Sequence, residues 1–259
     1  MIPATNPEEL LSLCRELSAK GISGCLISGG CLPDGSVPLD PFVEAMSRIK
    51  KDLGLTVAVH TGIIGKETAK KLAGAGVDVA LIDVIGSDET IREIYRLNVT
   101  VGDYEDSLRA LEAAKIPFVP HLIVGLHYGK LLGESRALDM IARHTPNGLV
   151  IIALIPLRGT PLHDAPAPEP SDVARVIAEA RLKMPGTPLA LGCMRPKGMH
   201  RALTDVLAVE AGVNGIAFPA EEAIRRAETF GLETSFLPIC CSQIFEDFRR
   251  GTFTLSRTH

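Results

Sequence analysis

Seven short apolar runs, rich in β-branched residues, alternate with helical segments, and this alternation constrains the fold more than any other feature. The runs begin near Ile22, Leu55, Val77, Pro117, Leu149, Pro188 and Asn214. They follow one another at intervals of about 32 residues, which is close to one βα unit. Because continuous apolar runs are typical of parallel strands buried on both faces, the pattern predicts an α/β fold of the TIM-type (β/α) barrel class.

The helical segments carry residues that favour helix starts and stops. Thr5-Asn6-Pro7, followed by two glutamates, predicts a helix that begins near residue 7, and Lys20-Gly21 predicts its end. Further helices are expected over residues 103–114, 133–143, 171–183, 199–211 and 220–230. The chain therefore opens with a helix rather than with a strand.

A helix that stands first in a strictly alternating series implies a strand before it. We therefore expect seven of the eight βα units in this sequence, with the first strand missing because it lies upstream of Met1. Two alternatives stay open at this point. In the first alternative, the barrel is naturally seven-stranded or otherwise incomplete. In the second, the strands form an open doubly wound sheet.

Composition excludes several classes of function. With 46% hydrophobic residues and no composition shift, the chain is expected to form one domain over residues 1–259, with a C-terminal tail from about residue 232. The formal net charge of -4 gives no basic field, so neither nucleic acid nor a membrane is an expected partner. The sequence shows no signal peptide or membrane span, which predicts a cytoplasmic protein that acts on a small molecule.

In a (β/α) barrel the site is built by the loops after the strands, and here those loops are rich in Gly and polar residues. Ser28-Gly29-Gly30 would let a ligand approach the backbone, although the same residues are equally consistent with a plain tight turn. Asp83 ends an apolar strand, where a bare carboxylate is costly to bury, so it should meet a ligand hydroxyl, a cation or a helix end. His60 and His121 are candidate catalytic acid/base groups or ligands, or else hydrogen-bonded core residues.

The six cysteines are better interpreted as thiols or metal ligands than as a disulfide framework. Cys31 and Cys193 follow two strands, and Cys240 and Cys241 are adjacent near the C-terminus. Together they are candidate ligands of an iron-sulfur cluster, but cysteine is also a common small core residue. The proline-rich segment 158–170 is either a stiff lid or a solvated connection.

The order of the strand ends resembles that of biotin synthase and its archaeal-type homologues in the radical S-adenosylmethionine (SAM) superfamily. The likeness covers nearly the whole chain and depends on collinear pieces, each weak alone. The pieces are residues 54–62, 75–78, 103–125, 159–162, 180–185, 191–195 and 211–215. In that family a [4Fe-4S] cluster, held by a Cys-x-x-x-Cys-x-x-Cys loop after the first strand, cleaves S-adenosylmethionine reductively. This sequence contains no such motif.

The resemblance implies roles for matching positions. Ser28, Gly29 and Gly30 would hold the methionyl part of S-adenosylmethionine, and Asp83 would hold its ribose hydroxyls. Adenine would be flanked by the strand end that comprises Ile123, Val124, Gly125 and Leu126. Arg195 matches an arginine beside the sulfur-donating cluster of biotin synthase, and is a candidate catalytic residue. The cysteines that ligate that cluster have no match here, which argues against biotin synthase activity and leaves Cys31, Cys193, Cys240 and Cys241 for a different auxiliary cluster.

Within this family the pattern is most similar to one half of the two-protein lipoyl synthase of archaea and anaerobes. This implies hydrogen abstraction from an unactivated carbon, linked to sulfur insertion, with a lipoyl-type carrier as substrate and a second radical SAM subunit as partner. The chain alone is expected to be inactive without the upstream cluster motif. Two rivals remain: a non-catalytic barrel subunit that has lost the cluster loop, and a metal-dependent barrel lyase or hydrolase that uses His60, Asp83 and His121.

Overall fold

The computed structural model describes residues 2–237 and 240–244, and the chain divides into two compact units. Unit 1 comprises residues 1–82 and 96–119, and unit 2 comprises residues 83–95 and 120–259. The prediction of a single domain over residues 1–259 is not tested by this division and stays a prediction. Among the described residues, no helix combines the length and the apolar character needed to cross a bilayer.

The strands hydrogen-bond in the order β1-β2-β3-β4-β5-β6-β7, which is also their order along the chain. Their bounds are β1 Gly24–Ile27, β2 Thr56–His60, β3 Val79–Asp83, β4 Phe118–Val124, β5 Leu149–Ala153, β6 Leu189–Leu191 and β7 Gly215–Ile216. The described strand pairs are parallel. Sequential parallel strands with helices between them are the topology of a (β/α) barrel, so the predicted fold class is confirmed.

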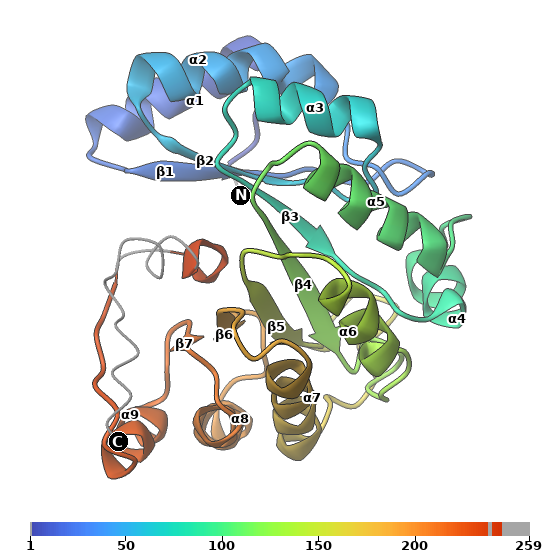
Figure 1. Cartoon of the computed structure of the whole chain (residues 1–259), viewed down its shortest axis with the longest axis vertical. Helices are drawn as coiled ribbons and strands as arrows, with labels where there is room; N and C mark the ends of the chain where they lie inside the picture. The colour runs from blue at the N-terminus through green and yellow to red at the C-terminus, as the bar shows by residue number, and fades with distance from the viewer. Residues whose placement is uncertain (1, 238–239, 245–259) are drawn as a thin grey trace. The chain divides into compact units, whose positions relative to one another are not determined.

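Unit 1 contains the first strands and the helices that cover them. The helices are α1 Pro7–Ala19, η1 Asp40–Phe42, α2 Val43–Leu53, α3 Lys66–Gly74 and α5 Val101–Ala113. Helices α1, α2 and α3 lie on one side of β1 and β2 (Figure 1). Helix α1 begins as predicted, because Asn6 accepts a hydrogen bond from the Glu9 amide and Pro7 occupies the first turn.

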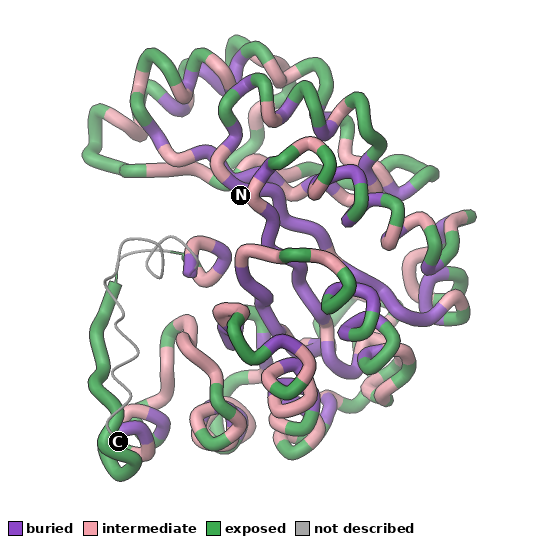
Figure 2. The backbone as a smooth tube through the Cα atoms, in the orientation of Figure 1, coloured by how far each residue is buried: buried purple, intermediate pink, exposed green. Residues whose placement is uncertain are grey.

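Unit 2 contains the remaining elements. They are α4 Asp88–Thr90, the π-helix η2 Ile91–Tyr95, α6 Glu134–Ala142, α7 Pro170–Lys183, α8 Met199–Glu210, α9 Glu221–Thr229 and the 3-10 helix η3 Cys241–Gln243. Strands β4 and β5 form the buried centre of this unit, as Figure 2 shows. Successive helices α7, α8 and α9 pack against their neighbours beside β5, β6 and β7. The sequence prediction located four of these elements, α6, α7, α8 and α9, but missed α4, η2 and η3.

Arg181 shows how polar groups support this packing. From α7 its guanidinium donates to the carbonyl oxygens of Gly212, Pro185 and Thr187 at 2.9 to 3.1 Å. The side-chain oxygen of Asn214 accepts from the Leu189 amide at 2.9 Å. These contacts fix the turns that lead into β6 and β7, and therefore set where the loops after both strands emerge.

Candidate functional site

The carboxyl end of β3 and the middle of β4 bring Asp83 and His121 together in unit 2. The Val84 amide donates to the His121 carbonyl oxygen at 2.9 Å, which holds the end of β3 beside β4. The side-chain ligand atoms of Asp83 and His121 lie within 4.8 Å of one another. His121 is buried and Asp83 is half-buried, so the carboxylate is reachable at the strand end. A carboxylate in this position can accept hydrogen bonds from hydroxyl groups of a ligand.

The end of β4 turns sharply at Gly125, and this turn tolerates no side chain. The φ of Gly125 is 73°, and an added Cβ would lie 2.7 Å from the Cβ of Pro168. Ile123 and Leu126 on either side are half-buried, and Val124 is buried. The strand end therefore offers the half-buried apolar side chains of Ile123 and Leu126 beside a buried turn, a surface that suits a flat aromatic ligand.

Glu134, the first residue of α6, hydrogen-bonds to this turn. Its Oε1 accepts a hydrogen bond from the Gly125 amide at 2.8 Å, and the residue is buried. Burial raises the pKa of the Glu134 carboxyl, although hydrogen bonds from nearby backbone amides oppose that shift. Its Oε2 has no hydrogen-bond partner among the described residues. The sequence prediction did not identify Glu134, because its partner is a backbone group nine residues earlier.

The proline-rich segment 158–170 packs against the loop after β4. Pro168 lies against Gly125, and an added Cβ on Gly129 would lie 2.2 Å from the Pro166 carbonyl oxygen. The Pro168 carbonyl oxygen is also 2.7 Å from Nε2 of His200. These contacts fix the C-terminal part of the segment, so any lid motion would have to involve residues before Pro166. The lid itself stays a prediction.

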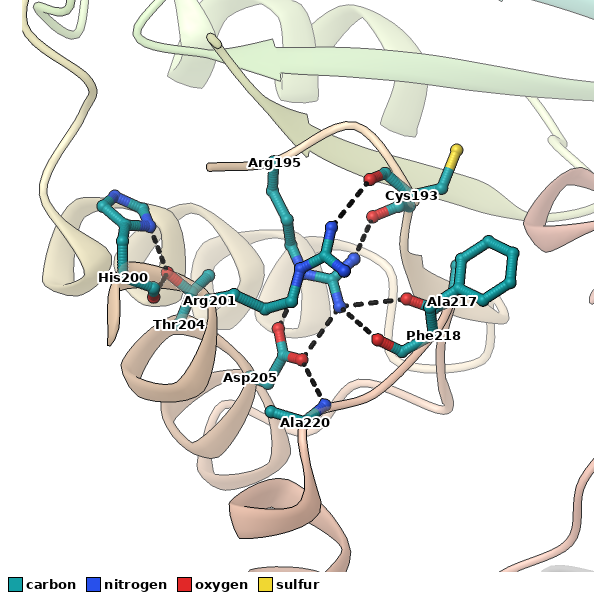
Figure 3. A network of polar contacts seen from close by, with 10 residues as sticks. Cys193, Arg195, His200, Arg201, Thr204, Asp205, Ala217, Phe218 and Ala220 are labelled. Atoms are coloured by element: carbon teal, nitrogen blue, oxygen red, sulfur yellow. Dashed lines mark hydrogen bonds and ion pairs between the residues drawn. The ribbon is translucent and has the colours of Figure 1, made fainter. Parts of the chain in front are cut away.

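Arg195 lies in the loop after β6 and is wholly buried (Figure 3). Its Nε and Nη2 donate to the two carboxylate oxygens of Asp205 at 2.6 and 2.8 Å. Its remaining contacts are with backbone carbonyl oxygens, those of Gly192, Ala217 and Phe218. The second carboxylate oxygen of Asp205 also accepts from the Ala220 amide at 2.9 Å.

This network ties the loops after β6 and β7 to α8 and to the start of α9. A guanidinium with so many protein acceptors is held in one position, which favours a structural role for Arg195. Its catalytic role stays a prediction. The sequence could identify Arg195 as a polar residue after a strand, but nothing in it pointed to Asp205 as the partner.

Two adjacent thiols in unit 2, those of Cys240 and Cys241, contact one another, with Cys193 nearby. Sγ of Cys240 lies 4.0 Å from Sγ of Cys241 and accepts a hydrogen bond from the Ser242 hydroxyl at 3.3 Å. Cys193 lies close enough to Cys241 to influence the acidity of the Cys241 thiol electrostatically. The Cys193 side chain points away from the Arg195 guanidinium (Figure 3). Of the four predicted metal-ligating cysteines, Cys240 and Cys241 therefore lie side by side, and Cys193 lies near Cys241. The described residues hold no group of three thiols whose sulfur atoms all lie within 4.8 Å of one another, so the cluster stays a prediction.

These contacts change the acidity of the thiols. The hydrogen bond from Cys241, helped by Ser242 and opposed by burial, lowers the pKa of Cys240 to about 5. The pKa of Cys241 is raised, because its proton is donated to Cys240 and the group is desolvated. The pair therefore holds one thiolate at neutral pH, and a thiolate is both a soft metal ligand and a nucleophile.

We expect Cys240 to react with iodoacetamide at neutral pH faster than an ordinary thiol. Since its thiolate persists down to a pH of about 5, the rate should stay flat between about pH 6 and 8 and fall below that. The site of alkylation is identified by mass spectrometry of peptides after short pulses. The variant Cys240→Ser should lose the fast phase. A rate that rises steadily up to pH 9 in the wild type would contradict the assignment.

The remaining predicted site residues belong to unit 1 and are described within it. Gly29 and Gly30 follow β1 and are exposed, and a Cβ on Gly30 would meet nothing within 4 Å. Cys31 is exposed, and His60 is the half-buried last residue of β2. The backbone of Gly29 and Gly30 is therefore exposed, and the role of residues 28–30 in ligand binding stays a prediction.

The described residues fit S-adenosylmethionine better than they fit the catalytic [4Fe-4S] cluster, the other cofactor that the resemblance implies. Within unit 2, the half-buried Asp83 carboxylate and the apolar strand end at residues 123–126 are suited to the ribose and adenine groups of S-adenosylmethionine. Within unit 1, the exposed backbone of Gly29 and Gly30 is suited to its methionyl group. The 259 residues do not supply the Cys-x-x-x-Cys-x-x-Cys ligands of the catalytic [4Fe-4S] cluster. That cluster therefore does not fit the residues present in this chain.

Comparison with known proteins agrees with the topology. Residues 3–129 match the profile of the radical SAM superfamily. Biotin synthase of Nitrosococcus oceani is 29% identical over 219 residues, which cover 82% of this chain and 60% of that protein. Biotin synthase of Paramagnetospirillum magneticum is 30% identical over 220 residues, covering 81% of this chain and 63% of that protein. The chain thus spans about three-fifths of the length of these relatives.

Solved structures support the fold. Methylornithine synthase aligns with a TM-score of 0.59 at 17% identity, over 94% of this chain and 75% of that one. HydG, a maturase of the [FeFe]-hydrogenase, aligns with a TM-score of 0.65 at 17% identity, over 96% of this chain and 62% of that one. The predicted resemblance to the radical SAM superfamily and to biotin synthase is confirmed.

Proposed function

Because this chain belongs to the radical SAM superfamily, we propose that it binds S-adenosylmethionine at its strand ends and serves a reaction of the biotin and lipoyl synthase-like type. The reaction would abstract hydrogen from an unactivated carbon and be linked to sulfur insertion, on a small molecule or a lipoyl-type carrier. The observation that carries the proposal is the match of residues 3–129, together with collinear similarity to biotin synthases over about four-fifths of the chain.

When bound, S-adenosylmethionine and the catalytic cluster supply the radical chemistry, and the protein supplies position and exclusion of water. Asp83 would accept hydrogen bonds from the ribose hydroxyls, and Gly125 with its apolar neighbours would flank adenine. The backbone of residues 28–30 would bind the methionyl group. Glu134 would keep Gly125 in position without contacting the ligand, because it already holds the Gly125 amide.

The thiols of Cys193, Cys240 and Cys241 would hold an auxiliary iron-sulfur cluster in this scheme, with Cys31 as the fourth candidate ligand. Their support is chemical: soft thiolates suit iron-sulfur clusters, and Cys240 has a lowered pKa. The ligands of the catalytic cluster would come from outside these 259 residues, either from a longer form of the chain or from a second radical SAM subunit. We propose a cytoplasmic location and anaerobic conditions for the reaction.

The first experiment tests binding alone. Isothermal titration of the 259-residue protein with S-adenosylmethionine should give one site, and Asp83→Asn should weaken it tenfold to a hundredfold, since a hydrogen bond to a charged group contributes about 1.5–3 kcal/mol. Asp139→Asn, which changes an exposed carboxylate on α6, is the matched control and should bind normally. Failure of the wild type to bind would overturn the proposal.

A second experiment separates the enzyme from the non-catalytic rival. A longer protein that includes the in-frame sequence upstream of Met1 is reconstituted anaerobically with iron and sulfide, then assayed for 5'-deoxyadenosine. Iron binding with production of 5'-deoxyadenosine supports the enzyme. Binding of S-adenosylmethionine with neither iron nor product in that protein would favour a binding subunit instead.

A further inference from the structure

A second cluster of ligand-type side chains lies away from the thiols. Glu89 in α4, Glu93 in η2 and His127 in the loop after β4 all belong to unit 2. Their ligand atoms lie within 4.8 Å of one another. One imidazole nitrogen and two carboxylates are a donor set that first-row divalent metal ions bind.

The distance between His127 and Glu89 is informative. Nε2 of His127 is 3.8 Å from Oε1 of Glu89, which is too long for a hydrogen bond. Two ligand atoms, each about 2.1 Å from a tetrahedral zinc ion, lie roughly 3.4 Å apart. The observed separation is thus close to the distance between two atoms that bind the same ion, and larger than the donor–acceptor distance of a direct hydrogen bond.

His127 is already oriented for such a role. Its Nδ1 lies 3.2 Å from the Oγ1 of Thr90, and Thr90 is almost wholly buried. If Nδ1 carries the proton and donates it to Thr90, the lone pair of Nε2 faces the glutamates. Metal-bound histidines are commonly held in this way through their second nitrogen. The His127 side chain is only 13% exposed, so the ring has little freedom to turn away.

Apart from His127, no cation among residues 2–237 and 240–244 pairs with the two glutamates. Glu89 and Glu93 are four residues apart on one helical segment, where like charges repel. Glu93 makes no ion pair within residues 2–237 and 240–244, and the adjacent cation Arg92 pairs with neither glutamate there. Arg136 is paired with Asp88 instead, at 3.5 Å. A divalent cation would neutralise the two carboxylates while His127 remains neutral.

From this geometry we propose that Glu89, Glu93 and His127 form a binding site for a first-row divalent metal ion such as Zn²⁺ or Co²⁺. Both glutamates are exposed, so water completes the coordination. The ion joins the α4–η2 segment to the loop after β4. The site is independent of the function proposed above, because it uses none of the thiols and none of the residues assigned to S-adenosylmethionine.

Co²⁺ is the probe, because its absorption spectrum reports its ligands. Metal-free protein should bind one equivalent at this site, with d–d bands and without the intense thiolate charge-transfer absorption that cysteine ligands would produce. His127→Gln and Glu93→Gln should each weaken this binding at least tenfold. Thr90→Val, which removes only the partner of Nδ1, should weaken it about tenfold to a hundredfold.

Glu228→Gln, on the exposed face of α9, is the control and should bind as the wild type does. Circular dichroism checks that each variant is folded. If Thr90→Val does not fold, Glu93→Gln still tests the site, because Glu93 is exposed. The proposal is overturned if the wild type shows only thiolate-ligated Co²⁺. It is equally overturned if His127→Gln and Glu93→Gln bind Co²⁺ as tightly as the wild type.

Discussion

Replacing Arg195 by Ala is expected to lower the free energy of unfolding by about 3–5 kcal/mol. The side chains of Arg195 and Asp205 are both 0% exposed. Removal of the guanidinium would leave a buried carboxylate with only the Ala220 amide as a hydrogen-bond donor in the network described here. It would also leave the carbonyl oxygens of Gly192 and Ala217 without their charged donor. Urea denaturation followed by circular dichroism measures the change.

The control is Arg225→Ala. Arg225 pairs with Glu221 at 3.0 Å, but the two side chains are 57% and 80% exposed, so its loss should change stability by no more than about 0.5 kcal/mol. The double variant Arg195→Met, Asp205→Leu should recover much of the stability that Arg195→Ala loses, because it removes both buried charges. If Arg195→Ala were as stable as Arg225→Ala, the structural role would be wrong and the catalytic prediction would gain weight.

Gly129→Ala is expected to release the proline-rich segment from the loop after β4. Gly129 has a φ of 82°, and the new Cβ would lie 2.2 Å from the Pro166 carbonyl oxygen. The strained backbone costs about 1–2 kcal/mol, and the clash with another backbone costs roughly 1–3 kcal/mol more unless the segment moves. We expect faster proteolysis within residues 158–170, measured by mass spectrometry after limited digestion.

Gly159→Ala separates strain from contact. Gly159 has nearly the same φ, 83°, but a Cβ there would meet nothing within 4 Å. It should therefore cost only the backbone strain, about 1–2 kcal/mol, and leave the packing of Pro166 and Pro168 unchanged. If both variants were digested at the same rate, the packing of the segment on Gly129 would not be what restrains it.

The repeating elements were the predictable part of the fold. Buried parallel strands read as apolar runs, so all seven were located, and most helix bounds differ from the prediction by one or two residues. The segment α4–η2 was missed because three α-helical and five π-helical residues are too short to show a helical period. Strand β7 was predicted, but only two residues of it pair.

The candidate site was predictable only residue by residue. Polar strand ends such as Asp83, His121 and Arg195 are visible in the sequence because they interrupt apolar runs. Their partners are not visible: Glu134 holds a backbone amide, and Asp205 is one helix away from Arg195. Cys193 and Cys241 are far apart in the sequence, and their proximity is visible only in the structure. The prediction could therefore name groups but not their contacts.

The Arg195–Asp205 pair has a consequence for how this end of the chain can change. One guanidinium and one carboxylate hold the loop after β6, the loop after β7 and the first turn of α9 at once. Local opening of either loop must break the same ionic contact, so the two loops should open and close as one cooperative unit. An insertion in one loop would displace the other loop as well. If the two loops form part of a substrate site, changes in their sequence and length would therefore have to occur together.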